Sequence, residues 1–315
     1  MQFTDQSMQE IIGSLSDAVA SMDEGDVIAF DVLDPDEGKG YAGEEVVIDG
    51  KSYIYRGYKS WVGLAELLKC KMLTPHSSVY PFVSLHFEKL QTDSFHTASS
   101  DDRKEKYGTE SDFFTIRKME EPSFLYYYTE ALENVKIASR RRVLDLGVNR
   151  GDEFEVIKNL LDIKEYQAME LVGIDHSESA IAYAKTRFDD ANVSFVAEDI
   201  NALDSLGLER FDLIISIGTL QSPGIRFKPF LMKLVQEYLH KEQGAMILGF
   251  PNSRWIGGEM IYGAKAPNYA MSELSLLFND VIFAKKYLQQ HKFRVTITGK
   301  EYIFLTATKI GHRED

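Results

Sequence analysis

The chain has 315 residues, 44% of them hydrophobic, so it is long enough to bury a sizeable core and to hold two domains. Its formal net charge of −14 opposes general binding to phosphate backbones, although a local basic groove is left open. A single cysteine, Cys70, excludes an internal disulfide and a thiolate metal cluster. No apolar run approaches the roughly 18 residues of a membrane span, and the acidic N-terminus lacks the basic start of a secretory signal, so we expect a soluble cytoplasmic protein.

Residues 1–112 are expected to form an N-terminal α+β domain. This domain could bind the acceptor or substrate of a reaction, or it could mediate dimerisation. Apolar residues at helical spacing predict a helix over 6–22. A second helix is expected to begin at Ser60, whose hydroxyl would cap it, and to run to residue 72. Cys70 would then be a small buried residue of that helix.

Strands are expected between and after these two helices. Residues 26–33 read as a strand, and Asp49-Gly50 predicts a two-residue hairpin turn because both residues tolerate positive φ. Pro81 indicates that the strand over 78–90 lies at a sheet edge or begins near the proline. The polar stretch 96–111 is typical of a linker or a mobile loop.

From residue 113 to 315 the pattern changes to a second domain in which strands and helices alternate, with Pro122 near the start of its first helix. The earlier strands are continuous apolar runs, as expected when helices cover both faces of a parallel sheet. The short turn at Gly299-Lys300 predicts that the last two strands form an antiparallel hairpin. We therefore expect a doubly wound α/β domain with strands at 141–147, 169–175, 193–199, 211–218, 244–250, 292–299 and 301–310, and with helices at 152–163, 177–188, 227–240 and 272–290.

In such a sheet, ligands bind beyond the carboxyl ends of the strands, where the strand order reverses. The first strand ends at Asp145 and leads into a turn from Gly147 to Gly151, and the second ends at Asp175. The third is expected to end at Glu198-Asp199, and the fourth at Gly218-Thr219. A ligand site at the carboxyl ends of these strands is therefore expected to contain several acidic and few basic side chains.

A dinucleotide site would carry G-x-G-x-x-G and a pyrophosphate on the first helix. Here the glycines are spaced G-x-x-x-G, and Asp152 and Glu153 in the first turn of the helix would repel a phosphate. A cationic or zwitterionic ligand without phosphate fits better. It should carry a ribose, because Asp175 lies about where an acid binds ribose hydroxyls.

Four segments in order resemble motifs of the class I S-adenosylmethionine-dependent methyltransferases: VLDLGVNRG, LVGIDHSESAIAYAK, FVAEDINAL and FDLIISIGTLQSP. The resemblance covers roughly residues 120–310. It implies a mostly parallel seven-stranded sheet of order 3-2-1-4-5-7-6 whose last strand is antiparallel. It also implies S-adenosyl-L-methionine as the cofactor.

The resemblance implies a role for each cofactor-site position. Gly147 and Gly151 would let the backbone approach the methionine part, while Asp145 would sit near its ammonium or order the loop. Asn149 stands where the family usually has a glycine, and asparagine tolerates the left-handed conformation that this turn would need. Asp175 would bind the ribose, and Asp199 would bind the adenine, with Ile200 packing near the ring. Gly218 and Thr219 would border the transferred methyl group. His176 would lie at the edge of the cofactor or on the surface.

Each acid also has a structural interpretation that the sequence leaves open. Asp145 could only support the fold, Asp175 could only cap a helix, and Asp199 could be a surface turn residue. Ser177 is available as an alternative helix cap.

The acceptor side of the site is expected to involve residues 251–269, a long loop after the fifth strand. Arg254, Glu259 and Tyr262 are its weak catalytic candidates, with Lys265 nearby, and packing of the loop on the N-terminal domain is the alternative. GTLQSP stands where methylases of base amino groups often have an Asn/Asp-Pro-Pro-aromatic segment, which weakens a nucleobase acceptor. No carboxylate set for magnesium is recognised, so no metal is expected.

The leading hypothesis is a methyltransferase that moves a methyl group from S-adenosylmethionine to a small-molecule or protein acceptor by in-line displacement, largely through positioning. A tRNA methyltransferase or related group transferase is an alternative, supported by the basic residues Arg117, Lys118 and 140–142. A non-catalytic cofactor-binding module is another, and a nicotinamide-dependent oxidoreductase is a weaker rival. A homodimer is left open, and no membrane partner is expected.

Overall fold

The computed structural model describes residues 1–91, 108–264 and 276–311. The chain divides into two compact units. Unit 1 comprises Met1–Thr97 together with Trp255–Ile261, and unit 2 comprises Ala98–Arg254 together with Tyr262–Asp315. The predicted linker over 96–111 lies outside the described residues up to 107. Within the described ranges, no helix is long and apolar enough to cross a membrane.

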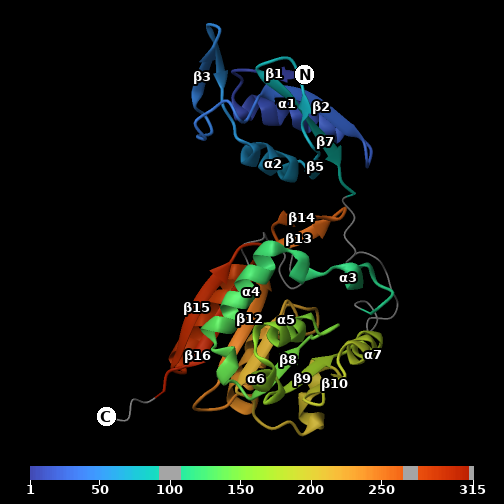
Figure 1. Ribbon diagram of the computed structural model, residues 1–315, viewed down its shortest axis with the longest axis vertical. Helices are drawn as coiled ribbons and strands as arrows, with labels where there is room; N and C mark the ends of the chain where they lie inside the picture. Colours follow the sequence, from blue (N-terminus) through green and yellow to red (C-terminus); the bar gives the residue numbers. More distant parts are fainter. Residues whose placement is uncertain (92–107, 265–275, 312–315) are drawn as a thin grey trace. The chain divides into compact units, whose positions relative to one another are not determined.

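Unit 1 is an α+β unit in which two helices pack on one face of a sheet (Figure 1). The sheet has the order β1-β2-β7-β5, with β6 also paired to β7. Phe30 and Leu85 point from its two central strands into a core with Ile11 and Trp61 of the helices. The elements are β1 Gln2–Phe3, α1 Met8–Ala20, β2 Val27–Leu33, β3 Glu45–Ile48, β4 Lys51–Ile54, α2 Tyr58–Leu67, β5 Cys70–Met72, β6 His76–Ser77 and β7 Phe82–Lys89.

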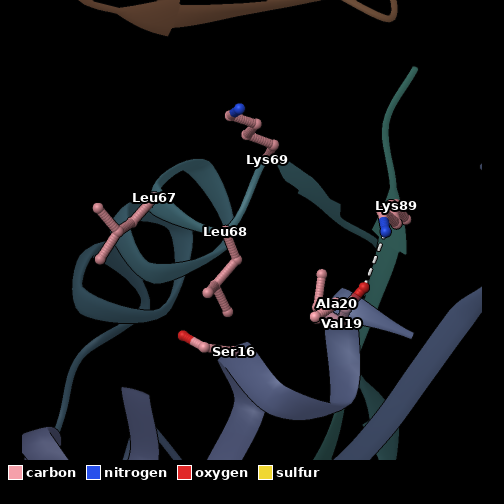
Figure 2. Close-up of a pocket in the computed structure, with 7 residues that line it drawn as sticks. All are labelled: Ser16, Val19, Ala20, Leu67, Leu68, Lys69 and Lys89. Carbon is pink, nitrogen blue, oxygen red and sulfur yellow. Dashed lines mark hydrogen bonds between the residues drawn. The ribbon is translucent and has the colours of Figure 1, made fainter. Parts of the chain in front are cut away.

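Helix α1 begins at a reciprocal capping box. Ser7 Oγ accepts a hydrogen bond from Glu10 N, and the Glu10 carboxylate accepts one from Ser7 N at 2.7 Å. At the other end, the Lys89 ammonium donates to the carbonyl of Val19 at 2.8 Å (Figure 2). It also donates to the carbonyl of Met22 at 2.6 Å. These bonds satisfy backbone groups that the helix termini would otherwise leave unpaired. Beside Lys89 lies an open hollow of about 400 Å³, which Ser16 and Leu68 also line.

Two predictions about the second helix are wrong. Helix α2 begins after Gly57 without a side-chain cap, so Ser60 lies inside the helix rather than at its start. Lys69 then adopts φ 57°, which ends the helix and turns the chain into β5. Cys70 is buried as predicted but lies in that strand, where it pairs with Lys89 of β7. Pairing with an existing strand has outweighed the helical preference of the local sequence.

The expected hairpin and the expected effect of Pro81 are both confirmed. Asp49 and Gly50 have φ 49° and 75° and join β3 to β4. Strand β7 begins directly after Pro81, although it is a central strand rather than an edge, because it pairs with β2 on one side and with β5 and β6 on the other.

Unit 2 contains the predicted doubly wound domain. Its seven-stranded sheet has the order β10-β9-β8-β11-β12-β16-β15, which is 3-2-1-4-5-7-6 when the strands are counted from β8. Strand β16 runs antiparallel to both β12 and β15, as the short turn predicts. The strands are β8 Arg142–Leu146, β9 Glu170–Asp175, β10 Val193–Ala197, β11 Leu213–Ile217, β12 Ala245–Pro251, β15 Phe293–Gly299 and β16 Tyr302–Lys309.

Helices cover both faces of this sheet (Figure 1). Alternate residues of β8, Val143 and Leu144, enter two different cores. The core with Val143 is closed by α4, α5 and α7, and the core with Leu144 is closed by α8 and α10. The helical elements are α3 Asp112–Thr115, the 3-10 turn Lys118–Glu120, α4 Pro122–Asn134, the 3-10 turn Ile137–Ser139, α5 Asp152–Leu160, α6 Ile163–Gln167, α7 Glu178–Arg187, the 3-10 stretch Ile200–Leu206, α8 Phe227–Lys233 with a π turn Leu234–Tyr238, and α10 Ile282–Gln290 after a π turn Leu277–Val281.

Some element boundaries differ from the prediction, and one lies partly outside the described residues. The helix expected over 152–163 is two helices, because Asp162 Oδ1 accepts hydrogen bonds from Lys164 N and Glu165 N and starts α6. The third strand ends at Ala197 rather than at Asp199. The helix expected over 272–290 is described only from residue 276, and the residues before it lie outside the described ranges.

Candidate active site

The candidate site lies in unit 2, at the carboxyl edge of the parallel sheet. Strand β8 lies between β9 and β11, and the strand order reverses there, which is where ligands bind in sheets of this kind. The turn after β8 is fastened to the end of β9, because Gly147 N donates a hydrogen bond to the Ile174 carbonyl at 2.8 Å.

Two glycines let the backbone turn where side chains would not fit. Gly147 has φ 81°, and a Cβ on it would collide with Thr219 Oγ1. Gly218 has φ 74°, and a Cβ on it would collide with the Tyr302 hydroxyl. The end of β11 therefore closes directly over the turn after β8, and the predicted neighbours Gly147, Gly218 and Thr219 are brought together.

Asn149 and Asp175 are joined by a backbone hydrogen bond. Asn149 has φ 45°, so the expectation that asparagine supports a left-handed turn is confirmed. Its N–H donates to Asp175 Oδ2 at 3.0 Å, and Ser177 N donates to Asp175 Oδ1 at 3.0 Å. Oδ2 still has one lone pair for another donor, while Oδ1 also lies 3.4 Å from His176 Nδ1. Asp175 thus orders the loop and keeps acceptor capacity that could serve hydroxyl groups.

Asp145 is a buried acid whose Oδ2 accepts no hydrogen bond from any described residue. Burial raises the pKa of the Asp145 carboxyl well above its ordinary value, and the neighbouring charges of Glu153 and Asp175 raise it further. Burial and repulsion from Asp152 and Asp175 also raise the pKa of Glu153, from 4.5 to about 7. Asp145, Glu153 and Asp175, which we call the carboxylate cluster, therefore form a site that a cationic ligand would stabilise.

The two first-turn acids of α5 differ in their environment. Asp152 pairs with Arg187 at 2.5 Å and with Arg150 at 3.4 Å, so two guanidinium groups neutralise its charge. Glu153 lacks such a pairing among the ion pairs of the described residues, and it contributes to the carboxylate cluster. Nothing in the sequence separates Glu153 from Asp152, so Glu153 was not predictable as a site residue.

The other predicted cofactor positions lie at the same edge. Asp199 is exposed and caps the stretch Ile200–Leu206 through a 2.8 Å bond from Asn201 N. Ile200 is buried. His176 is partly exposed, with Nδ1 3.4 Å from Asp175 Oδ1. Gly151 has φ 83°, and a Cβ on it would lie 2.8 Å from the Phe188 ring, so this glycine permits close packing of the turn.

Lys118 and Tyr302 meet beside Gly218, although 184 positions separate them in the chain. Lys118 Nζ donates to the Tyr302 hydroxyl at 3.1 Å and lies 4.7 Å from the centre of the Tyr302 ring. It would also be 3.6 Å from a Cβ placed on Gly218, and it opposes the rise in the pKa of Glu153. Two hydrogen-bond donors thus border the end of β11. In the sequence, Lys118 stands out only as one of several basic residues, and Tyr302 carries no signal of a site residue.

The loop expected after the fifth strand is a hairpin. Strands β13 Ser253–Ile256 and β14 Glu259–Tyr262 are joined through Gly257 and Gly258, both with positive φ. Its tip belongs to unit 1, where Ile256 and Ile261 pack on Leu90.

Two of the three catalytic candidates of this loop, Arg254 and Glu259, have structural partners. Glu259 pairs with Lys71 of unit 1 at 3.1 Å. Arg254 donates to the carbonyls of Tyr262 at 3.5 Å and of Gly263. Tyr262 is exposed, and Lys265 lies outside the described residues.

The basic residues near β8 do not form one free surface. Arg140 is buried and donates to the carbonyls of Val135 and Gln243. Arg142 pairs with Glu170 at 2.6 Å and with Glu209 at 3.0 Å. The support that these residues lend to tRNA binding is correspondingly weaker. Within the ranges that the structure covers, no three His, Cys, Asp or Glu side chains are grouped so as to hold a metal ion.

Comparisons with known proteins agree with this domain. Residues 137–293 match a family model described as a methyltransferase domain. Malonyl-(acyl-carrier protein) O-methyltransferase of Bacillus anthracis is 40% identical over 80 residues, a segment that spans 25% of this chain and only 27% of that relative.

Solved methyltransferases are also similar to this chain. A precorrin-6y C5,15-methyltransferase from Geobacter metallireducens GS-15 is 14% identical with a TM-score of 0.41, covering 59% of this chain and 88% of its own. An S-adenosylmethionine-dependent methyltransferase from Aquifex aeolicus is 16% identical with a TM-score of 0.40, covering 57% and 90%.

The sheet order, the four ordered motifs and the family model define the class of the domain. Unit 2 therefore contains a class I S-adenosylmethionine-dependent methyltransferase domain, whose cofactor is S-adenosylmethionine.

Proposed function

We propose that the protein transfers the methyl group of S-adenosylmethionine to an anionic oxygen of a small-molecule acceptor. The carboxylate cluster is the observation that carries the cofactor half of this proposal. It is a set of partly or fully buried acids beside a glycine turn, in which Lys118 opposes the rise in the pKa of Glu153. Such a set favours a ligand that carries positive charge and disfavours one that carries phosphate.

The residues present suit this cofactor. The orphaned Asp145 Oδ2 and Glu153 would face its positive charges, and Gly147 would let the backbone approach. Asp175 would accept from the ribose hydroxyls with the lone pair that remains on Oδ2, and Asp199 and Ile200 would border the adenine. When bound, the cofactor supplies a methyl group activated by a sulfonium.

Lys118 and Tyr302 carry the acceptor half of the proposal. Lys118 Nζ and the Tyr302 hydroxyl lie 3.1 Å apart beside the end of β11. Together these two donors would hold an oxygen anion such as a carboxylate or a phenolate. The partial relative from Bacillus anthracis is named as an O-methyltransferase, which fits an oxygen acceptor. An oxygen that is already ionised needs no general base, so positioning by the two donors could supply much of the acceleration.

Calorimetry with S-adenosylmethionine and S-adenosylhomocysteine tests the cofactor half. Binding of neither would overturn the proposal. Formation of S-adenosylhomocysteine in the presence of a panel of small carboxylic acids and phenols tests the acceptor half. Cofactor binding without turnover of any panel member would favour a non-catalytic module over this proposal.

The variants Tyr302→Phe and Lys118→Met separate the two halves. Each should lower turnover of the acceptor at least about tenfold, since a hydrogen bond to a charged group is lost, and each should leave cofactor affinity within about threefold. A Lys118→Met protein that loses cofactor affinity would assign Lys118 to the cofactor instead. Unit 1 is proposed to serve acceptor recognition or dimerisation, and sedimentation of the full chain tests the second of these.

A further inference from the structure

A basic groove lies at the opposite edge of the unit 2 sheet from the carboxylate cluster. It has a volume of about 760 Å³ and is formed where α4 ends, beside the start of β15 and the end of β16. Its lining includes four cationic side chains and a ladder of threonines, namely Lys136, Arg140, Arg294, Lys309, Thr306 and Thr308. None of the described residues that line it is acidic, although the whole chain has a net charge of −14.

The groove exists because α4 is shorter than the strands it covers. Helix α4 packs on Phe304 near the middle of β16 and ends at Asn134. Lys136 then takes φ 55°, and the chain turns away towards β8. The hairpin face beyond Phe304 stays open, and its cross-strand pairs there are Thr296 with Thr306 and Arg294 with Thr308.

The cations of the groove are held in place by uncharged groups. Arg140 is buried, and its guanidinium donates to the carbonyl of Val135 at 2.7 Å and to that of Gln243. Lys309 Nζ donates to the carbonyl of His291 at 2.7 Å. Burial and the nearby charge of Lys292 lower the pKa of Lys309, so positive charges crowd this edge.

The carboxylate of Asp212 is close enough to Arg140 to interact with it electrostatically. It raises the pKa of Arg140, against the larger lowering by burial. Its two oxygens accept hydrogen bonds from the backbone of Arg141 at 2.8 Å and of Arg142 at 2.7 Å. It therefore compensates only part of the positive charge. Lys136 and Arg294 are exposed and face solvent with their charges available to a ligand.

We propose that this groove binds a small molecule that carries a phosphate or diphosphate group. Arginine and lysine donors are the residues that suit phosphate oxygens, and threonine hydroxyls supply further hydrogen bonds. A cavity of this size holds a compact ligand rather than a length of polymer. A long polyanion is disfavoured because the acidic remainder of the surface would repel it.

The test is a calorimetric titration of the full chain with inorganic diphosphate and with inorganic phosphate at constant ionic strength. The test variant is Arg294→Gln with Lys136→Gln, two exposed residues whose replacement leaves the structural bonds of Arg140 and Lys309 intact. The matched control is Lys164→Gln with Lys185→Gln, which removes the same charge from exposed positions on α6 and α7. Circular dichroism melting confirms that both variants are folded.

The expected result is saturable binding of diphosphate with one site per chain, tighter than the binding of phosphate. The affinity for diphosphate should fall at least about tenfold in the groove variant and less than about twofold in the control. Equal weakening in both variants would reduce the effect to overall charge and overturn the proposal. So would an absence of diphosphate binding to the wild-type chain, or binding of bulk tRNA without binding of diphosphate.

Discussion

We expect the ionised Glu153, which would bind a cationic ligand, to lower the stability of the folded protein. Its pKa is raised from 4.5 to about 7, mainly by burial and then by Asp152 and Asp175. A carboxyl group whose pKa is raised on folding favours the folded state at low pH, and this advantage is lost as the pH rises from about 4.5 to about 7. Above that range the ionised Glu153 costs the folded state about 3 kcal/mol.

The variant Glu153→Gln removes the charge and keeps the size of the side chain. Linkage then predicts that the variant is more stable than the wild type by about 1 kcal/mol at pH 5 and by about 3 kcal/mol at pH 8. Glu155→Gln is the matched control from the same helix. Glu155 pairs with Arg187 at 2.5 Å, so its replacement should not stabilise the protein.

Urea unfolding followed by circular dichroism measures this difference. Tryptophan fluorescence would not follow the relevant unit, because Trp61 and Trp255, the two tryptophans of the chain, both belong to unit 1. A Glu153→Gln protein that gains no more stability at pH 8 than at pH 5 would refute the argument that burial and repulsion raise this pKa.

The same ionisation should control cofactor affinity. If the ionised Glu153 is the form that binds S-adenosylmethionine, the fraction ionised rises from about a tenth at pH 6 to about nine tenths at pH 8, and the affinity rises about tenfold. Glu153→Gln should bind more weakly and without this pH dependence. Methylthioadenosine, which lacks the positive charges, should show no such dependence with either protein.

Three further predictions follow from single contacts. Gly147→Ala should destabilise unit 2 by more than about 2 kcal/mol in urea unfolding, because Gly147 has φ 81° and the added Cβ would meet Thr219. Gly207→Ala is the control and should cost about 1 kcal/mol, because Gly207 has φ 59° but open space around it. Asp175→Asn should weaken S-adenosylmethionine binding by about 1 to 3 kcal/mol in calorimetry, and unchanged affinity would count against ribose binding there. Lys89→Met should destabilise unit 1 by about 1 to 2 kcal/mol in tryptophan-monitored unfolding, because two carbonyls at the end of α1 lose a charged donor, and an unchanged midpoint would contradict this.

Much of unit 2 could be predicted from the sequence, because its elements carry strong local signals. Buried parallel strands are continuous apolar runs, and the short turn at Gly299-Lys300 requires the last strand to reverse. The site acids Asp145 and Asp175 were predictable for the same reason, since they stand where those runs end. The predictions were weaker where the helix preference of the local sequence competes with strand pairing. Cys70 is an example, because it pairs with β7 instead of extending a helix.

The sequence by itself determined the strands of unit 2, the antiparallel hairpin at its end and the left-handed turn at Asn149, because each depends on residues close together in the chain. The strand order and the cofactor followed from the resemblance to the methyltransferase family. Only the tertiary structure decided which acid of the first turn of α5 has a raised pKa. Asp152 is neutralised because α7 brings Arg187 beside it, while Glu153 interacts electrostatically with Asp145 and Asp175. Likewise, Lys118 and Tyr302 carry no local signal as a pair, and packing of remote segments alone places their donors at the end of β11.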